Sequence, residues 1–195
     1  DFDFGMKLGS GKYGTVFLAR HKKFKQFGWS QIEIKIIFKR IGSDEKKIIK
    51  KVAEKEIVSH KALYGIPNVI DFYGWFEDEK RYYLLIEFLE CKNLYEVIDR
   101  KSLPYDKVKK WAYEILLGLK GIHDRGYVHS DMKPENVMLE CDANKKPFRA
   151  KIADFGLTKS IGESCSEPIG TLDYLSPEII LEDSKTFDPP RDMWA

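Results

Sequence analysis

Three glycines near the start of the chain have a spacing that suits contact with phosphate. Gly9, Gly11 and Gly14 lie in GSGKYG, between two stretches of strand-like composition. Residues without a Cβ let backbone N–H groups approach phosphate oxygens closely. The same spacing in a dinucleotide-binding domain opens a helix, whereas here the β-rich run TVFLA follows. The pattern therefore favours a glycine-rich turn between strands, with a dinucleotide oxidoreductase as a distant alternative.

A second set of polar residues occurs later in the chain in a fixed order. It consists of HSDMKPEN at 129–136, DFG at 154–156 and SPE at 176–178. Together with the glycines, this order resembles the eukaryotic protein kinases, whose pattern is a Gly-rich loop, a strand lysine, HRDxxxxN, DFG and APE. GTLDYLSPE and LGSGKYGTVFLAR look most like the Aurora group of that family.

The resemblance implies an enzyme that transfers the γ-phosphate of ATP, with Mg²⁺, to Ser or Thr of a protein substrate. Phosphoryl transfer places negative charge on three equatorial oxygens, so the site needs metal ions, a cation and a positioned nucleophile. Asp131 is expected to accept the proton of the substrate hydroxyl, and Lys133 to steady the transferred group. Asn136 and Asp154 are expected to hold Mg²⁺. Thr171 is expected to bond Asp131, which supports the choice of Ser/Thr.

The resemblance also assigns a lysine to the nucleotide phosphates and a glutamate to hold that lysine. Lys35, in IEIK, takes the place of the strand lysine that reaches the α- and β-phosphates. Its partner is expected on the helix that follows. We predict Glu54, 19 residues further on, because Ile57 and Val58 then seat the helix against the core. Glu56 is the alternative.

Adenine is expected in a flat apolar slot between the two halves of the domain. The backbone from Glu87 to Leu89 is expected to pair with the base, beside Ile86, and Asn93 to reach the ribose. The other residues that the resemblance assigns to the nucleotide are Leu8, Gly9, Gly11, Gly14, Val16, Met138 and Ala153. Four side chains are expected to stack between the halves: Val58, Phe72, His129 and Phe155.

Three residues depart from the family pattern. Glu33 replaces the alanine of VAIK and would bring a carboxylate toward adenine. Ser130 replaces the arginine of HRD and cannot make its bidentate contact with a phosphate on the activation segment. Ser176 replaces the alanine of APE. The change at Ser176 is mild, but Glu33 and Ser130 leave open a pseudokinase, which would act as a nucleotide- or partner-binding scaffold.

The activation segment, residues 154–178, is predicted to be held by a fixed charge. Glu167 occupies the place where Aurora-like kinases carry the regulatory threonine. Lys159 or Lys50 is expected to receive its carboxylate. The alternative is that Glu167 is a solvated loop charge.

The hydrophobic pattern predicts an α+β fold with two lobes around these residues. Strand signals run from Phe4 to Phe38 and return at 72–76 and 82–88, with one helix that starts at Ser43 and ends before Gly65. This describes an antiparallel sheet, which the resemblance makes five-stranded. Apolar residues at helical spacing across 108–122 and a small hairpin at 137–139 and 151–153 follow. The predicted boundaries are 1–87 for the N-lobe, 88–93 for the hinge and 94–195 for a partial, mainly helical C-lobe.

Charge and composition exclude some classes of protein. The chain has 33 Lys plus Arg and 31 Asp plus Glu, and its net charge of +2 gives no reason to expect nucleic-acid binding. The first 51 residues carry a surplus of +8, which suits either a solvated face or an anionic ligand. The longest strongly apolar stretch, Tyr82 to Ile86, is far too short to span a membrane. No regulatory partner is indicated.

The cysteines and the two ends of the chain give further expectations. Cys91, Cys141 and Cys165 lie far apart without a CxxC spacing, so we predict neither a disulfide framework nor a zinc site. A reducing compartment follows, hence an intracellular protein of the cytoplasm or nucleus. The chain starts at Asp1 and ends where the family begins a buried helix, so we expect a segment truncated at the C-terminal side.

Overall fold

The computed structural model describes residues 2–10, 14–22, 31–39, 43–98, 102–164, 169–181 and 186–195, with 43–47 described by their backbone alone. The chain divides into two compact units, residues 1–61 with 71–88 and residues 62–70 with 89–195. Residues 62–70 group with the second unit because their backbone pairs with a strand there. The Ile152 amide donates to the Asn68 carbonyl at 2.8 Å, and the Ile70 amide donates to the Ile152 carbonyl at 2.9 Å.

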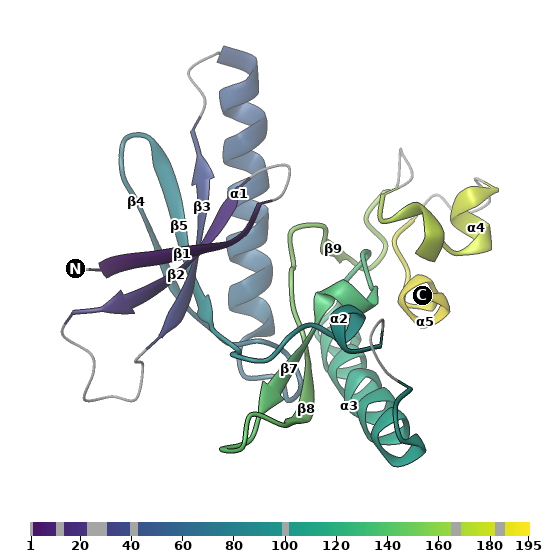
Figure 1. Ribbon diagram of the computed structural model, residues 1–195. Helices are drawn as coiled ribbons and strands as arrows, with labels where there is room; N and C mark the ends of the chain where they lie inside the picture. The colour runs from purple at the N-terminus through teal and green to yellow at the C-terminus, as the bar shows by residue number, and fades with distance from the viewer. Residues whose placement is uncertain are drawn as a thin grey trace. The chain divides into compact units, whose positions relative to one another are not determined.

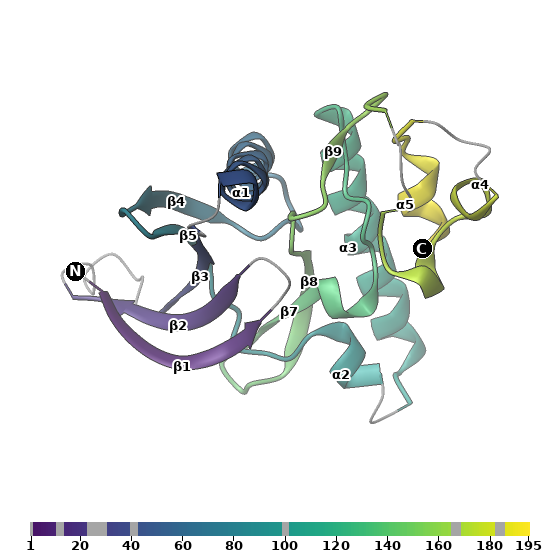
Figure 2. The same ribbon diagram turned by 90° about the horizontal axis from the view of Figure 1, so that it is seen from above.

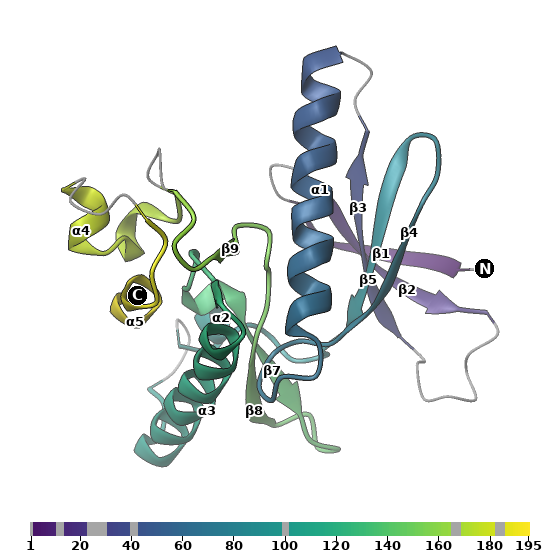
Figure 3. The same ribbon diagram turned by 180° about the vertical axis from the view of Figure 1, so that it is seen from behind.

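The first unit is an antiparallel sheet with one helix (Figure 1). Its elements are β1 (Phe2–Ser10), β2 (Thr15–His21), β3 (Ile32–Phe38), α1 (Ser43–Leu63), β4 (Phe72–Glu77) and β5 (Arg81–Glu87). The strand order is β1-β2-β3-β5-β4, and every neighbouring pair is antiparallel. The predicted five-stranded sheet is confirmed. Helix α1 lies beside one face of it (Figures 2 and 3).

Strand β3 sends alternate side chains to opposite faces of the sheet. Ile32, Ile34 and Ile36 pack on one face in a cluster that includes Ala19. Lys35 lies on the other face and contacts α1. The alternation of the strand thus aims the predicted functional lysine at the helix.

Helix α1 has one buried face. Ala53, Glu56, Ile57 and His60 are all buried and follow the i, i+3, i+4, i+7 spacing of a single helical stripe. Glu54 is exposed. Residues two positions apart on a helix differ by about 200° in direction. Glu54 and Glu56 therefore point to nearly opposite sides of α1.

The second unit combines one long helix, α3, and several short ones with two small antiparallel pairs of strands. Its elements are α2 (Leu94–Ile98), α3 (Tyr105–Asp124), β6 (Tyr127–Val128), η2 (Pro134–Asn136), β7 (Val137–Cys141), β8 (Pro147–Ile152), β9 (Lys159–Ser160), η3 (Leu172–Tyr174), α4 (Pro177–Ile180) and α5 (Pro190–Trp194). Strand β7 pairs with β8, and β6 with β9. Helix α3 packs against β8 closely enough that a Cβ on Gly118 would lie 2.9 Å from the Ile152 side chain. In the parts of the chain described above, none of the helices has the length and apolar character needed to cross a membrane.

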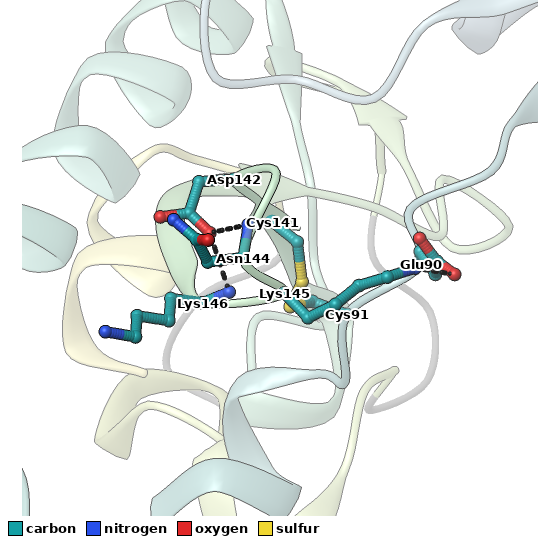
Figure 4. The surroundings of a disulfide bond; sticks show 7 residues. All are labelled: Glu90, Cys91, Cys141, Asp142, Asn144, Lys145 and Lys146. Carbon is teal, nitrogen blue, oxygen red and sulfur yellow. Dashed lines mark hydrogen bonds and ion pairs between the residues drawn. A yellow bond between two sulfur atoms is a disulfide. The ribbon is translucent and has the colours of Figure 1, made fainter.

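Cys91 and Cys141 form a disulfide bond, so the prediction that the chain has no disulfide framework is wrong (Figure 4). Their Cα atoms are 5.6 Å apart although 50 residues separate them in the sequence. Asn93 forms an isolated bridge with Met138, which brings the segment after β5 alongside β7. Sequence spacing detects only cysteines that are close along the chain. Cys165 lies outside the described residues.

Candidate active site

The residues around Asp131 form a compact hydrogen-bonded group in the second unit. The Lys133 ammonium lies 2.9 Å from Asp131 Oδ2, and the Thr171 hydroxyl donates to Asp131 Oδ1 at 2.7 Å. Lys133 also donates to the Thr171 hydroxyl at 2.7 Å. The predicted contact between Thr171 and Asp131 is confirmed. The group places a carboxylate and a cation side by side, next to Thr171 of the activation segment.

Asn136 connects this group to the segment that carries the second carboxylate. The Asn136 Nδ2 donates to the Asp131 backbone carbonyl at 2.7 Å and to the Asp131 Oδ2 at 3.1 Å. The Asn136 Oδ1 takes no part in these two hydrogen bonds. The Asn136 backbone carbonyl accepts from the Ala153 amide at 2.9 Å. Asp154 follows directly, with φ of 62° in the left-handed region. Asn136 and Asp154 are thus held by one backbone pairing.

A buried aspartate that the sequence analysis did not identify holds the loop before Asp131. Asp192, in α5, accepts the backbone amides of His129 at 2.8 Å and Ser130 at 2.9 Å with its two carboxylate oxygens. The His123 ring nitrogen lies 2.9 Å from the same carboxylate. Ser130 has φ of 70°, a conformation that costs free energy in a residue other than glycine. Asp192 therefore stabilises a strained turn at the site.

His129 is a packing residue, as expected. Its Nδ1 accepts the Asp131 amide at 3.2 Å, so its Nε2 carries the hydrogen that donates to the Ala153 carbonyl at 3.0 Å. Its ring meets Phe155 edge-on, with centroids 5.4 Å apart. Because both ring nitrogens are engaged with the backbone, the imidazole braces the Asp131 loop against DFG.

Lys35 pairs with Glu56 in the first unit, so the prediction of Glu54 as its partner is wrong. The Lys35 ammonium lies 2.6 Å from Glu56 Oε1, and the two side chains are 17% and 2% exposed. Glu54 instead lies 3.7 Å from Lys50 on the exposed side. The reason is the buried stripe of α1, which contains Glu56 and excludes Glu54. Continuing the helical spacing from Ala53 by three residues reaches Glu56, a signal present in the sequence.

The prediction that Val58 stacks between the halves is also wrong, and again the buried residue lies two positions further along the helix. Val58 is 56% exposed. His60 occupies the buried position and stacks on Phe72, with ring centroids 4.8 Å apart. The His60 Nε2 atom is 3.9 Å from Glu56 Oε1, one helical turn away. Glu56 therefore lies between a lysine and a histidine.

The other residues predicted for the nucleotide lie in both units. Gly9 is opposite Val16 across β1 and β2, and Val16 is opposite Lys35 across β2 and β3. Leu8 is on β1 and Gly14 immediately precedes β2, while Gly11 lies outside the described residues. A Cβ on Gly14 would lie 2.7 Å from the Ile36 carbonyl oxygen, so this position requires glycine. The Glu87 carboxylate accepts the Asp71 amide at 2.9 Å.

In the second unit, Leu89 is buried and Met138 lies on β7. The Asn93 side chain accepts the Glu96 amide at 2.9 Å, which caps the start of α2. Its predicted contact with the ribose stays a prediction.

Glu33 lies on β3, opposite Ile86 of β5. Burial, together with the nearby Glu87 carboxylate, raises the pKa of Glu33 to about 7 from its usual 4.5. The raised pKa shows that ionisation of the Glu33 side chain at this position costs free energy, as expected. Near neutral pH this side chain is divided between its neutral and charged forms.

Comparison with known proteins gives a result that agrees with this geometry. The family model of the protein kinase domain matches residues 2–195, so the chain belongs to the protein kinase family. It is 33% identical to an Aurora kinase of Patiria pectinifera, over 100% of this chain and 46% of the relative. It is 34% identical to Aurora kinase B of Xenopus tropicalis, over 100% of this chain and 51% of the relative.

A plant relative is similar over a larger share of its length. The chain is 32% identical to serine/threonine-protein kinase Aurora-2 of Arabidopsis thaliana, over 100% of this chain and 64% of the relative. The chain thus spans about half the length of the first relatives that it matches. The resemblance to the Aurora group extends along the whole chain.

Proposed function

We propose that this protein transfers the γ-phosphate of ATP to serine or threonine hydroxyls of protein substrates. The observation that carries the proposal is the group of Asp131, Lys133 and Thr171, in which three contacts of 2.7 to 2.9 Å join the side chains. A carboxylate within hydrogen-bond reach of a substrate hydroxyl can accept its proton, and the adjacent ammonium can stabilise charge on the transferred group. Asp131 is the proposed base and Lys133 the proposed cation.

The residues proposed for Mg²⁺ and ATP fit those groups chemically. Asn136 and Asp154 offer amide and carboxylate oxygens, the donors that Mg²⁺ prefers, and Mg²⁺ commonly takes few protein ligands beside phosphate oxygens and water. Among the described residues there is no cluster of three or more His, Cys, Asp or Glu side chains that forms a separate metal site. Bound Mg²⁺ would neutralise phosphate charge. Lys35, oriented by Glu56, is the proposed contact for the α- and β-phosphates.

Two assays test the proposal against a scaffold without activity. The thermal unfolding midpoint should rise with ATP only when Mg²⁺ is present, and labelled γ-phosphate should appear on Ser or Thr of a generic basic protein. A Mg²⁺-dependent shift without transfer would indicate a pseudokinase. Absence of both would refute the proposal. A stabilising effect of NAD would support the dinucleotide alternative instead.

We further propose that the protein works in the cytoplasm or nucleus, where ATP and protein substrates are available. In such a reducing compartment the bond between Cys91 and Cys141 would be exposed to thiol reductants. Fractionation of cells followed by thiol labelling would show both the compartment and the state of the two cysteines. The substrate and any regulatory partner are still to be found.

A further inference from the structure

Arg191, in the short helix α5, is a buried cation next to the activation segment. It is 6% exposed, and its guanidinium lies over the Phe187 ring at 4.4 Å. Its Nη2 donates to the Ile169 backbone carbonyl at 2.9 Å. The next residue, Asp192, accepts hydrogen bonds from two backbone amides of residues 129–136, here called the catalytic loop. Two successive residues of α5 thus hold two different pieces of the site.

The segment that Arg191 holds packs directly on the catalytic loop. Ile169 precedes Gly170, where φ is 126° and an added Cβ would lie 2.8 Å from the Ser130 carbonyl oxygen. Thr171 follows and donates to Asp131 Oδ1 at 2.7 Å. Only Gly170 lies between the residue whose carbonyl Arg191 binds and the residue whose hydroxyl binds Asp131. A displacement of the Ile169 backbone should therefore also displace the Thr171 hydroxyl and the Asp131 carboxylate that it binds.

A small cavity lies between these pieces. Arg191, Ser130, Asp131, Thr171 and Ser176 are among the residues that line it, and its volume of about 10 Å³ corresponds to roughly one water molecule. Arg191 Nη1 and Ser176 Oγ are both buried and have no hydrogen-bond partner among the described residues. Both groups belong to residues that line this cavity. Arg191 thus has a second buried donor, and it lines the same cavity as Ser130, the position where the sequence lacks the arginine of HRD.

We propose that Arg191 is a positioning residue for Asp131. One nitrogen of its guanidinium donates to the Ile169 carbonyl, and the side chain lines the cavity beside Ser130 and Asp131. This contact fixes residues 169–171 so that the Thr171 hydroxyl orients the Asp131 carboxylate. The proposal rests on the proposed function, in which Asp131 is the base.

The test is a double-mutant cycle on peptide phosphorylation. Arg191→Met should lower kcat by about 10- to 100-fold with the KM for ATP nearly unchanged, because only the geometry at Asp131 is disturbed. Thr171→Ala should have a similar effect. The double variant should be little worse than either single variant, because both changes break the same connection. Arg149→Met, which removes an exposed arginine paired with Glu140 at 3.3 Å, is the matched control and should retain kcat.

A second variant, Arg191→Lys, keeps the proposal testable if Arg191→Met does not fold. Lysine keeps the charge and can donate to the Ile169 carbonyl, but it lacks the planar fork. The Lys variant should fold, should lose less kcat than the Met variant, and should show the same non-additivity with Thr171→Ala. Unchanged kcat in the Lys and Met variants, or effects that simply add to that of Thr171→Ala, would overturn the proposal.

Amide hydrogen exchange separates this proposal from the proposed function. The Tyr174 and Leu175 amides bond to the Thr171 and Leu172 carbonyls at 3.0 and 3.2 Å. Both should exchange faster in Arg191→Met and Arg191→Lys than in the wild type or Arg149→Met. If the wild type transfers no phosphate, the proposed function fails, and exchange still reports on the contact. Unchanged exchange at these amides would refute the role of Arg191 whatever the activity.

Discussion

Glu56 shares a buried ion pair with Lys35, and Glu54 on the same helix is exposed. Removing one member of a buried pair leaves the other charge without compensation, which costs about 3 kcal/mol or more. Glu56→Gln should therefore lower both the free energy of unfolding and kcat/KM for ATP, the latter by at least about ten-fold. Glu54→Gln is the matched control and should resemble the wild type in urea unfolding and steady-state kinetics. A larger effect for Glu54→Gln would restore the original prediction.

Glu33 gives a prediction about pH. Its pKa of about 7 in the folded protein, against 4.5 ordinarily, means that the folded state binds this proton more tightly than the unfolded chain. Below about pH 4.5 the side chain is neutral in both states and costs nothing. As the pH rises from about 4.5 to 7, the unfolded chain loses this proton while the folded protein still holds it, so folding is increasingly penalised. The penalty reaches about 3 kcal/mol and levels off above about pH 7, where the half-buried carboxylate is charged in the folded protein as well.

The measurement is the free energy of unfolding of wild type and Glu33→Gln between pH 4.5 and 8. The two should be similar at the acidic end, and Glu33→Gln should become the more stable by about 2 to 3 kcal/mol at pH 8. Glu79→Gln, at an exposed position, controls for the loss of one negative charge. A constant difference across this range would show that the Glu33 carboxylate is not buried in solution.

At the scale of the elements, the disulfide joins the segment after β5 to strand β7. Lys145, in the turn between β7 and β8, also pairs with Glu90, next to Cys91 (Figure 4). A bond that closes a loop of this length restricts the unfolded chain and stabilises the fold by about 2 to 4 kcal/mol. Cys91→Ser should lower the free energy of unfolding by that amount in urea under non-reducing conditions.

Reduction with dithiothreitol should reproduce the effect of Cys91→Ser and have no further effect on that variant. Cys165→Ser is the control, because Cys165 takes no part in this bond. Equal stability of the oxidised and reduced protein would contradict the expected contribution of the disulfide.

The elements with strong periodicity could be predicted from the sequence. The strands of the sheet, α1 and the β7–β8 hairpin all occur near their predicted positions, and α3 (Tyr105–Asp124) extends the predicted helix at both ends. In each case an apolar stripe or alternation extends over enough residues to identify the element. Helices α2 and α4 were not predicted, because a helix of four or five residues has no complete stripe. The helix at the position of α5 was expected from the family resemblance alone.

Site residues that belong to a sequence motif could be predicted. Residues whose role depends on contacts between distant parts of the chain could not. HSDMKPEN identified Lys133 and Asn136, which both contact Asp131 in the structure. The prediction of Glu54 is wrong because it placed Val58 on the buried face of the helix, whereas Val58 is exposed and Glu56 is buried. Asp192 and the Cys91–Cys141 pair depend on contacts across 62 and 50 residues, which no local pattern indicates.

The prediction for Glu167 lies outside the described residues. Its two expected partners, Lys159 and Lys50, lie near Glu163 and Glu54.

For the whole molecule, the proposed machinery is distributed over both units. The first unit carries Lys35 and Glu56, and the second carries Asp131, Asn136 and Asp154. The proposed roles differ in kind. Asp131 is the base for the substrate hydroxyl, whereas Asp154 is a ligand for the metal that accompanies ATP. This difference separates binding from transfer experimentally.

The most direct test compares Asp131→Asn with Asp154→Asn, using Mg²⁺-dependent binding of ATP and transfer of its γ-phosphate to a Ser/Thr peptide. Asp131→Asn should bind Mg²⁺ and ATP like the wild type and lose about 100-fold or more of the transfer rate. Asp154→Asn should lose the Mg²⁺-dependent part of ATP binding as well as transfer. Equal loss of binding in both variants, or full transfer by Asp131→Asn, would contradict the proposal that Asp131 is the base of a protein kinase.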